Sequence, residues 1–472
     1  MNYKKFLAGT LAVCMTASLV ACGDSTSDTT TASTDSGNDS AETTAEGVVT
    51  TEATEWTGDA VEVETEGYQK LDVDIDGQTM KWLGIYDLNP TNDSPERSVE
   101  LALFEDTYGA SIEYIPTTSS EMFNSLATNI LGGTSPDIFI YQWRSFPYDI
   151  SKNQYQSIDE LVDWDDLKWA DVKDIADKFI WQGEHYIAPL TYSFSDIQVL
   201  MYNKTTIEEE GFDDPYELYL ANEWDWDAFV EMMKTFVENG DGSTERYGIG
   251  GWWANAFVYT SGETMVTYDG EKFTNNLRST AIENAMSVLE DLSKNQLIKR
   301  GWISGESAFP ENDILFYSMG TWAYDAAQGA MPDDIIQIVP FPRNPDSDQY
   351  YVSNTVTAYM WVKGSENSDL VKAWFDVNRF VNYDDSYTEA TKEKYLTNNT
   401  NWTSEMYDIV MDFYDSDKFV QAYDYGYGLS TLMSDELMSL LYEGLANEQY
   451  ESWVQAREEY YTIVDEEIAA YQ

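Results

Sequence analysis

The sequence is poor in histidine, cysteine and positive charge. Its 472 residues hold one histidine, two cysteines, and 26 Lys and Arg against 85 Asp and Glu, for a formal net charge of -59. A lone imidazole is more often structural than a ligand, so a single histidine, His185, argues against histidine-dependent catalysis and against a histidine metal site. Phosphate contacts need clustered Lys and Arg, so the charge excludes a nucleic-acid partner. Such an acidic surface keeps a protein unaggregated.

Both cysteines lie near the amino terminus. Two lysines precede an apolar run over residues 6–20, which is typical of a secretory signal peptide and too short for a membrane span. The tract Leu19-Val20-Ala21-Cys22 resembles a bacterial lipobox, where the peptide is cleaved before a lipid-bearing cysteine. We therefore expect a lipoprotein signal peptide over residues 1–21 and a lipid anchor at Cys22. The mature chain then has no cysteine for disulfides, thiol catalysis or metal binding.

Low-complexity sequence follows the predicted anchor. From residue 23 to about 67 the chain is mostly Ser, Thr, Asp, Glu, Gly and Ala, which bury too little apolar surface to offset the entropy of ordering. We expect a disordered acidic linker over residues 22–70, with the folded part beyond it. A chain of 472 residues exceeds what one hydrophobic core usually supports, so two lobes are expected.

The first folded region alternates strand and helix patterns. Helical spacing over 97–108 and 122–132 separates apolar segments near residues 82, 112 and 138, an order that builds a mostly parallel α/β lobe. Ligands of such sheets sit beyond the carboxyl ends of the strands, which indicates Tyr141, Gln142 and Trp143. At its start, Asp72 to Asp76-Gly77 matches a calcium loop only in part, and a hairpin turn at Asp76-Gly77 is the better interpretation.

A second passage carries the most information. Ile197 to Tyr202 reads as a buried strand, Asn203 as the cap of a short helix, and Gly211 as its end. Tyr202-Asn203-Lys204, Gly211-Phe212 and the later Trp224-x-Trp-Asp-x-Phe resemble the extracellular solute-binding protein family 1, the binding proteins of carbohydrate-type ABC importers. Ser135-Pro136-Asp137-Ile138 and Gly320-Thr-Trp322 resemble other tracts of that family.

The resemblance implies an α/β fold of the periplasmic-binding-protein type II class, with two α/β lobes, a multi-strand hinge and a ligand cleft between them. The amino-terminal lobe would comprise residues 71–192 plus 356–395, and the other lobe 193–355 plus 396–472. It further implies a monomeric, lipid-anchored receptor on the outer face of the bacterial cell membrane, without cofactor, metal or catalysis. The receptor would pass a small ligand, a sugar or oligosaccharide, to an ABC permease.

Candidate ligand residues are aromatic platforms and carboxylates placed where the family lines its cleft. The aromatic side chains could stack on pyranose rings, and a carboxylate can accept two sugar hydroxyls. They are Trp322, Trp143, Asp196, Trp252, Trp253, Tyr324, Asp325, Tyr425, Tyr427 and Asp87. Asp196 could equally cap a turn, and Trp322 could belong to the core. On a strand Trp252 and Trp253 would face opposite sides, so at most one would reach a ligand.

Two other functions stay open. A glycosidase would need a pair of acidic residues flanking a bound sugar, and no local pattern identifies such a pair among the many Asp and Glu. A surface glycan-binding lipoprotein without a transport role would have the same fold, because fold does not fix function. A polar turn over residues 239–243 could bind calcium, although its carboxylates are few and loosely spaced.

Overall fold

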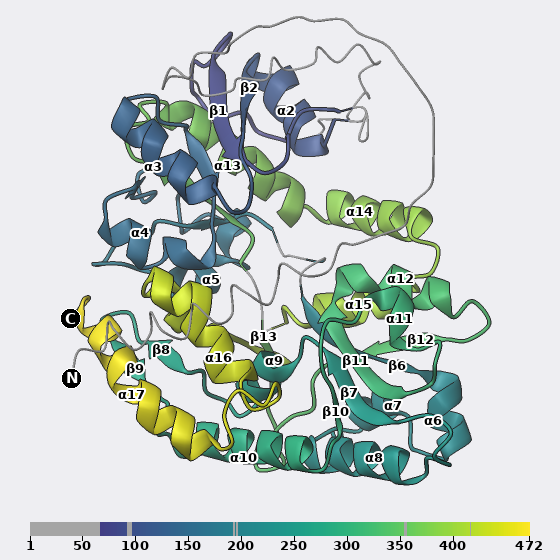
Figure 1. Cartoon of the computed structure of the whole chain (residues 1–472). Helices are drawn as coiled ribbons and strands as arrows, with labels where there is room; N and C mark the ends of the chain where they lie inside the picture. Colours follow the sequence, from purple (N-terminus) through teal and green to yellow (C-terminus); the bar gives the residue numbers. More distant parts are fainter. Residues whose placement is uncertain (1–66, 92–96, 192–193, 195–196, 354–355, 416) are drawn as a thin grey trace, which may run out of the picture. The chain divides into compact units, whose positions relative to one another are not determined.

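Two mixed sheets with helices beside them account for most of the described chain. The computed structural model describes residues 67–91, 97–191, 194, 197–353, 356–415 and 417–472, all within one unit, Thr50–Gln472. Figure 1 shows both sheets with their helices. Within these residues, no helix combines the length and apolar character needed to cross a membrane.

The first sheet draws on the amino-terminal region and on one strand from far along the chain. Its order is β2-β1-β3-β14-β4, with β5 paired to β14. The strands are β1 (Thr79–Gly84), β2 (Ser111–Pro116), β3 (Ile138–Ile140), β4 (Tyr155–Gln156), β5 (Ala188–Pro189) and β14 (Ala358–Val362). β1 runs parallel to both β2 and β3, which confirms the predicted parallel α/β pattern. β14 enters antiparallel to β3.

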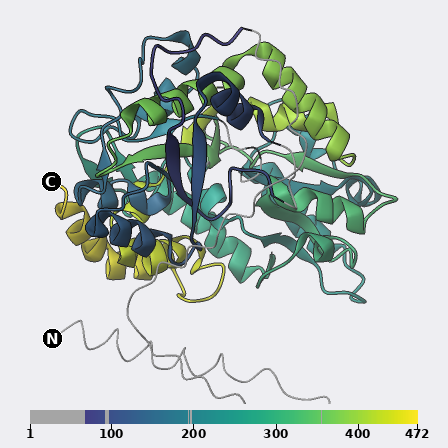
Figure 2. The same ribbon diagram turned by 90° about the horizontal axis from the view of Figure 1, so that it is seen from above.

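Two helices distant in sequence pack on each other beside β1. They are α2 (Val99–Tyr108) and α13 (Ser368–Tyr383). The Ser98 hydroxyl accepts a hydrogen bond from the Leu101 amide and begins α2, and Gly109 ends it with φ 69°. Phe104 meets Trp374 edge to face at 5.4 Å. Figure 2 shows the green α13 region beside the purple strands. Contacts between the two helices thus tie a late segment to the first sheet.

The hairpin predicted at Asp76-Gly77 is wrong. The turn is present, with Gly77 at φ 69°, but residues 71–75 form no strand. The Gly77 amide instead donates to the Gly109 carbonyl at 2.9 Å, and Ile75 is 1% exposed. The residues that alternate between apolar and acidic therefore form an arm that packs on the end of α2. Such a contact between segments distant in sequence cannot be recognised from the local pattern.

The second sheet has the order β10-β7-β11-β6-β12. Its strands are β6 (Gln198–Asn203), β7 (Tyr247–Gly251), β10 (Ile298–Lys299), β11 (Ile314–Gly320) and β12 (Ile336–Val339). β7 is parallel to β10 and β11, whereas β6 is antiparallel to β11 and β12. Every residue of β6 is buried, Asn203 Oδ1 accepts from the Thr205 amide at 2.9 Å, and Gly211 has φ 73°. The predicted passage from strand to capped helix is confirmed.

Helix α8 (Trp226–Glu238) packs on β7 in the second sheet. The Asp225 carboxylate accepts hydrogen bonds from the Asp227 and Ala228 amides and begins the helix. Phe229, Met233 and Phe236 recur at helical spacing on its buried face. Each such side chain stabilises the fold by about 1.5–3 kcal/mol through burial.

Other helices and two small sheets complete the described chain. The helices are α3 (Met122–Gly132), α4 (Tyr148–Ser151), α5 (Lys173–Asp177), α6 (Lys204–Glu210), α7 (Pro215–Leu220), α9 (Ala254–Tyr259), α10 (Thr280–Lys294), α11 (Gly305–Ala308), α12 (Tyr324–Ala330), α14 (Asp385–Asn398), α15 (Ser404–Asp412), α16 (Met438–Glu443) and α17 (Trp453–Ala469). Short turns of tighter or wider helix are η1 (Trp143–Ser145), η2 (Leu167–Trp169), η3 (Thr321–Ala323), η4 (Tyr425–Gly428) and η5 (Met433–Leu437). β13 (Tyr350–Ser353) pairs with β15 (Phe419–Ala422), and β8 (Val266–Tyr268) with β9 (Phe273–Asn275).

Candidate functional site

A cavity rich in aromatic side chains lies at the carboxyl end of β3. We call it the aromatic cavity, and its volume is about 740 Å³ with its open mouth counted. Its lining residues are Ile140, Tyr141, Gln142, Trp143, Phe146, Phe179, Val356, Thr357, Tyr423, Asp424, Tyr425 and Gly428. It therefore joins the end of β3, the segment before β14 and the start of η4, which are far apart in sequence.

The end of β3 places three of these side chains. The Tyr141 amide donates to the Ala358 carbonyl at 2.8 Å, which continues the pairing with β14 past the last strand residue. The Gln142 amide donates to the Ser145 hydroxyl at 3.3 Å and so begins the η1 turn that carries Trp143. Tyr141, Gln142 and Trp143, predicted as the strand-end positions, thus line one cavity.

Asp424 fixes the opposite wall. Its carboxylate is 3% exposed and accepts hydrogen bonds from the amides of Met265 (2.8 Å), Val266 (3.1 Å) and Gly426 (2.8 Å), and from the Tyr442 hydroxyl. Burial raises the pKa of Asp424 to about 6, although these hydrogen bonds oppose the shift. One buried side chain therefore holds η4 against β8 and α16.

Tyr425 and Gly428 complete that wall. The Tyr425 hydroxyl donates to the Lys178 carbonyl at 2.9 Å, and its ring packs on Phe146 and Phe179 with centroids 5.9 and 5.5 Å away. A Cβ on Gly428 would lie 1.7 Å from the Phe146 carbonyl oxygen. Only glycine allows this approach of η4 to the chain after η1. The wall is thus preformed and tightly constrained.

A line of ring contacts leads from this cavity toward α16. Trp143 and Tyr427 have ring centroids 4.8 Å apart at 45°, and Tyr427 and Tyr442 are stacked at 6.3 Å and 7°. The next residue, Glu443, lines a second cavity. The two cavities therefore lie on either side of one set of packed rings.

We call this second cavity the tryptophan pocket. Its lining residues are Gly251, Trp252, Trp253, Ala254, Ile298, Lys299, Arg300, Gly301, Trp302, Glu443, Ala446 and Asn447. β7 ends at Gly251, so Trp252 and Trp253 follow the strand, contrary to the strand placement considered above. Trp252 is half-buried, and Trp253 precedes α9 and is 3% exposed. Both line the pocket, but Trp253 is buried and Trp252 is only half-buried.

The other predicted residues lie outside both cavities. Trp322 is 53% exposed in η3, at the carboxyl end of β11, and is therefore no core residue. Tyr324 is 1% exposed and meets Trp402 at 4.8 Å, while Asp325 accepts a hydrogen bond from the Asn401 side chain at 3.2 Å. Asp87 accepts two from Asn89. The ligand roles of these residues stay predictions.

Asp196 and Cys22 lie outside the described residues. The cavities in turn contain residues that sequence reasoning missed, namely Phe146, Phe179, Asp424 and Trp302. Asp424 stands directly before the Tyr-Gly-Tyr-Gly tract, a position where Asp often accepts hydrogen bonds from the following turn. That signal could have identified Asp424, whereas the two phenylalanines carry none.

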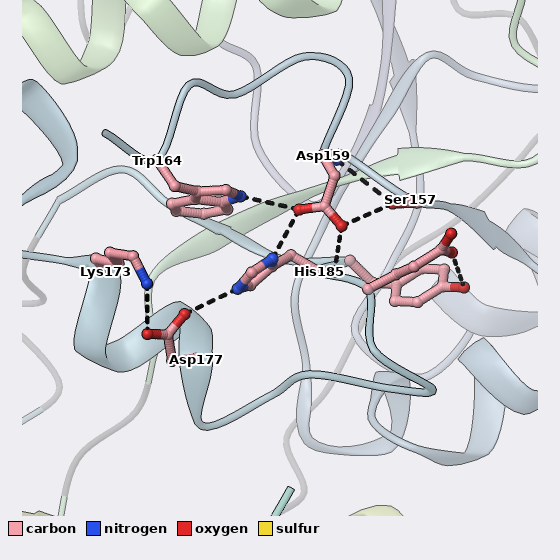
Figure 3. A network of polar contacts seen from close by, with 8 residues as sticks. Ser157, Asp159, Trp164, Lys173, Asp177 and His185 are labelled. Atoms are coloured by element: carbon pink, nitrogen blue, oxygen red, sulfur yellow. Dashed lines mark hydrogen bonds and ion pairs between the residues drawn. The ribbon is translucent and has the colours of Figure 1, made fainter. Parts of the chain in front are cut away.

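His185 has a structural role, as Figure 3 shows. Its Nδ1 is 2.7 Å from Asp159 Oδ1, its Nε2 is 2.9 Å from Asp177 Oδ1, and the Trp164 ring lies 4.5 Å away. Burial raises the pKa of Asp159, but hydrogen bonds from His185 and Trp164 outweigh that effect and hold the pKa below its usual value. With both ring nitrogens engaged, His185 joins loop segments rather than binding a ligand. Among the described residues no cluster of His, Cys, Asp or Glu is placed to hold a metal ion.

Comparison with known proteins identifies a family for the chain. The family model of the bacterial extracellular solute-binding proteins matches residues 90–377. None of the curated proteins compared with the chain matches it.

Solved structures share the fold at low sequence identity. An ABC substrate-binding protein from Listeria monocytogenes, solved with cycloalternan, is 15% identical with a TM-score of 0.59, over 83% of this chain and 99% of that one. The cyclic alpha-maltosyl-1,6-maltose binding protein of Arthrobacter globiformis is 16% identical with a TM-score of 0.60, over 82% and 99%. UgpB from Mycobacterium tuberculosis, solved with glycerophosphocholine, is 15% identical with a TM-score of 0.57, over 78% and 94%.

These likenesses confirm the predicted α/β fold of the type II periplasmic-binding-protein class. The match to the family model extends over more than half of the chain. The protein therefore belongs to the bacterial extracellular solute-binding proteins, which are binding proteins of ABC importers and not enzymes.

Proposed function

We propose that this protein is a lipid-anchored receptor that captures a neutral carbohydrate in the aromatic cavity and delivers it to an ABC permease. One observation carries the proposal. Trp143 and Tyr425, from segments far apart in sequence, line the same cavity together with polar side chains such as Gln142 and Thr357. Flat aromatic faces with a few polar groups suit a pyranose ring, which has apolar faces and hydroxyl edges.

The charge of the cavity favours an uncharged ligand. None of its described lining residues is Lys or Arg, and recognition of a phosphate or carboxylate normally uses one of them. The glycerophosphocholine ligand of the Mycobacterium tuberculosis relative is therefore a poorer guide than the cycloalternan and cyclic alpha-maltosyl-1,6-maltose named for the other two. A neutral sugar or oligosaccharide fits both the aromatic lining of the cavity and its lack of described Lys or Arg residues.

Capture would involve two lobes, residues 71–192 plus 356–395 and 193–355 plus 396–472. The pairing of β14 with β3 supports this division, because it returns the chain to the first sheet. A ligand that binds the closed arrangement better shifts the equilibrium toward closure. The lipobox at Cys22 supports attachment of the receptor to the outer face of the cell membrane.

A glycosidase is the weaker alternative. Hydrolysis would need two carboxylates on either side of the bound sugar. Among the described lining residues of the aromatic cavity only Asp424 is acidic, and both its oxygens already accept hydrogen bonds within the protein. A glycan-binding lipoprotein without a transport role would differ from the proposed receptor only in lacking a permease. Deleting the gene for this protein should reduce uptake of the ligand by the cells if it is a transport receptor, and should leave uptake unchanged if it is not.

A thermal-shift screen of the full chain tests the proposal. The panel should contain mono- and oligosaccharides, amino acids and glycerophosphodiesters. A sugar at 100 times its dissociation constant should stabilise the native state by about 2.7 kcal/mol and raise the melting temperature. A rise with an amino acid or a phosphodiester, and with no sugar, would overturn the carbohydrate assignment.

A further inference from the structure

His185 lies between two carboxylates that come from different segments of the chain (Figure 3). Its Nδ1 is 2.7 Å from Asp159 Oδ1, and its Nε2 is 2.9 Å from Asp177 Oδ1. An ionised carboxylate only accepts hydrogen bonds, whereas a neutral imidazole has one N–H group and one lone pair. Both short contacts are therefore hydrogen bonds only while the ring carries two protons. When the ring loses one of them, one carboxylate is left facing a lone pair.

Other titratable groups lie on the segments around this contact. On α5, Lys173 donates to the second oxygen of Asp177 at 2.6 Å. Burial raises the pKa of Asp177, but hydrogen bonds from Lys173 and His185 outweigh that effect and hold the pKa below its usual value. Beside His185 in sequence, the Tyr186 hydroxyl donates to Glu184 at 3.1 Å. The carboxylates on the ring therefore stay charged near neutral pH, whereas histidine is the residue type whose charge ordinarily changes between about pH 5 and 8.

Asp177 ends α5 and begins a segment that builds part of the aromatic cavity. The carbonyl of the next residue, Lys178, accepts a hydrogen bond from the Tyr425 hydroxyl at 2.9 Å, and Phe179 lines the cavity. We call residues 177–180 the wall segment. Its first residue is thus attached to the imidazole, and the residues that follow shape the place where a ligand would bind.

The wall segment is held to α5 by hydrogen bonds of its backbone. The amides of Lys178 and Phe179 donate to carbonyls within α5 at 3.2 and 3.0 Å. These bonds fix the wall segment relative to α5, and the contact between His185 and Asp177 fixes the end of α5 relative to the loop over residues 157–164. Loss of that contact should therefore loosen the end of α5 and the wall segment together.

We propose that His185 is a positioning residue whose proton state determines how firmly the wall segment is held. With two ring protons it donates to both carboxylates, and this wall of the aromatic cavity is fixed. With one ring proton it releases one carboxylate, the wall segment loosens, and a sugar in the cavity binds more weakly. The receptor therefore binds a neutral sugar more tightly at mildly acidic than at alkaline pH. The effect on the sugar rests on the proposed function, whereas the effect on the wall segment does not.

Two measurements on the full chain without sugar test the positioning role. Because the chain has one histidine, labelling histidine with carbon-13 at Cε1 gives a single resonance that reports the proton state of His185 from pH 5 to 9. Hydrogen exchange of the peptide over residues 176–182, corrected for the intrinsic rate at each pH, reports how firmly the wall segment is held. We expect its protection to fall about fivefold or more as the resonance titrates, with the same midpoint.

Two variants separate a contact controlled by a proton from a merely structural one. The amide of Asp177→Asn can donate to a neutral ring or accept from a protonated one, so protection should stay within about twofold of its acidic wild-type value at every pH. His185→Gln has no titrating ring, and its protection should match that of the alkaline wild type throughout. Asp174→Asn is the matched control, because it removes the same charge from an exposed position of α5 and should titrate like the wild type.

Calorimetric titration with sugars tests the link to ligand binding. The probes are maltotriose, cellotriose, β-1,4-linked mannotriose and xylotriose, each at pH 5.5 and 8.5. We expect the affinity of the wild type for a sugar that binds to fall about threefold or more between these pH values, and the fall to vanish in Asp177→Asn. Asp424 also titrates in this range, but both proteins contain it, so its contribution cancels in the comparison.

The outcomes separate the two proposals. Constant protection in the wild type, or the same fall in Asp177→Asn, would overturn the positioning role. If a sugar binds with the same pH dependence in both proteins, the wall segment does not control affinity, and the proposed function stands without the effect of His185. If none of the sugars binds, the proposed function falls together with the effect on affinity, and hydrogen exchange still decides the positioning role.

Discussion

The aromatic cavity and the tryptophan pocket use the same kind of side chain in different states. In the aromatic cavity Tyr425 is 8% exposed and its hydroxyl is bonded to the Lys178 carbonyl, so the wall exists before any ligand arrives. In the tryptophan pocket Trp302 is 75% exposed. A preformed wall depends on buried polar groups such as Asp424, whereas an exposed ring such as Trp302 makes few contacts until a ligand covers it.

Removing the buried carboxylate should have the largest effect. Asp424→Ala leaves the Tyr442 hydroxyl and three amides without their acceptor, at about 1–3 kcal/mol for each buried unsatisfied group. We expect the free energy of unfolding to fall by about 3–5 kcal/mol in urea denaturation, because some groups will find water. Glu436→Ala, at an exposed position in η5, should change it by less than about 0.5 kcal/mol. A loss below 1 kcal/mol for Asp424→Ala would show that the wall does not depend on this carboxylate.

The same carboxylate should make stability depend on pH. The pKa of Asp424 is raised from 3.8 to about 6 in the folded state, so the native protein binds the extra proton between these values. Asp424 therefore makes its full contribution to the free energy of unfolding below about pH 4, and that contribution is lost as pH rises to about 6. The total loss is up to about 3 kcal/mol, at 1.36 kcal/mol per unit of pKa shift.

Denaturation of the wild type and Asp424→Asn from pH 4 to 7.5 isolates this contribution from the other carboxylates. We expect the wild type to lose stability relative to the amide variant as pH rises from 4 to about 6, and the difference to level off above that. A constant difference between the two proteins would contradict the shift in the pKa of Asp424.

Truncating a ring of the aromatic cavity should weaken ligand binding by an intermediate amount. Trp143→Ala removes a face that lines the cavity and should cost about 1–3 kcal/mol of binding free energy, or about 5- to 150-fold in affinity. Titration with the sugar that gives the largest thermal shift measures this. Trp143→Phe, which keeps a ring against Tyr427, should recover most of the affinity. An unchanged dissociation constant in the alanine variant would place the sugar elsewhere.

The smallest effect is expected for the stability of the unliganded tryptophan pocket. Trp302→Ala should change the free energy of unfolding by less than about 0.5 kcal/mol, because a side chain that is 75% exposed loses few contacts. Urea denaturation without sugar measures it. A loss of 2 kcal/mol or more would mean that Trp302 is a structural residue, and the contrast between the two cavities would fail.

Local signals in the sequence were enough for much of the fold. The cap of α6 at Asn203 and its end at Gly211 depend on neighbouring residues only, and both were predicted correctly. The arm over residues 71–75 was predicted as a strand because Val73 and Ile75 alternate with acids. The Gly77 amide that follows the arm donates to the Gly109 carbonyl, more than thirty positions away, and that contact has no local signature in the sequence. Pattern alone therefore misassigned this arm.

The candidate site could be predicted only where strand order determines it. Tyr141, Gln142 and Trp143 follow a parallel strand, and a strand end is a known ligand position, so they could be named in advance. The acceptor role of Asp424 toward Met265 and Val266 depends on how η4 meets β8, which requires the tertiary structure. Trp302 follows a strand of two residues, too short to detect by alternation.

A crystal structure of the full chain with the sugar that gives the largest thermal shift tests the central claim most directly. We predict that one pyranose ring lies against Trp143 or Tyr425 in the aromatic cavity, with hydrogen bonds from its hydroxyls to Gln142 or Thr357. Electron density for the sugar at a site away from these residues would contradict the account.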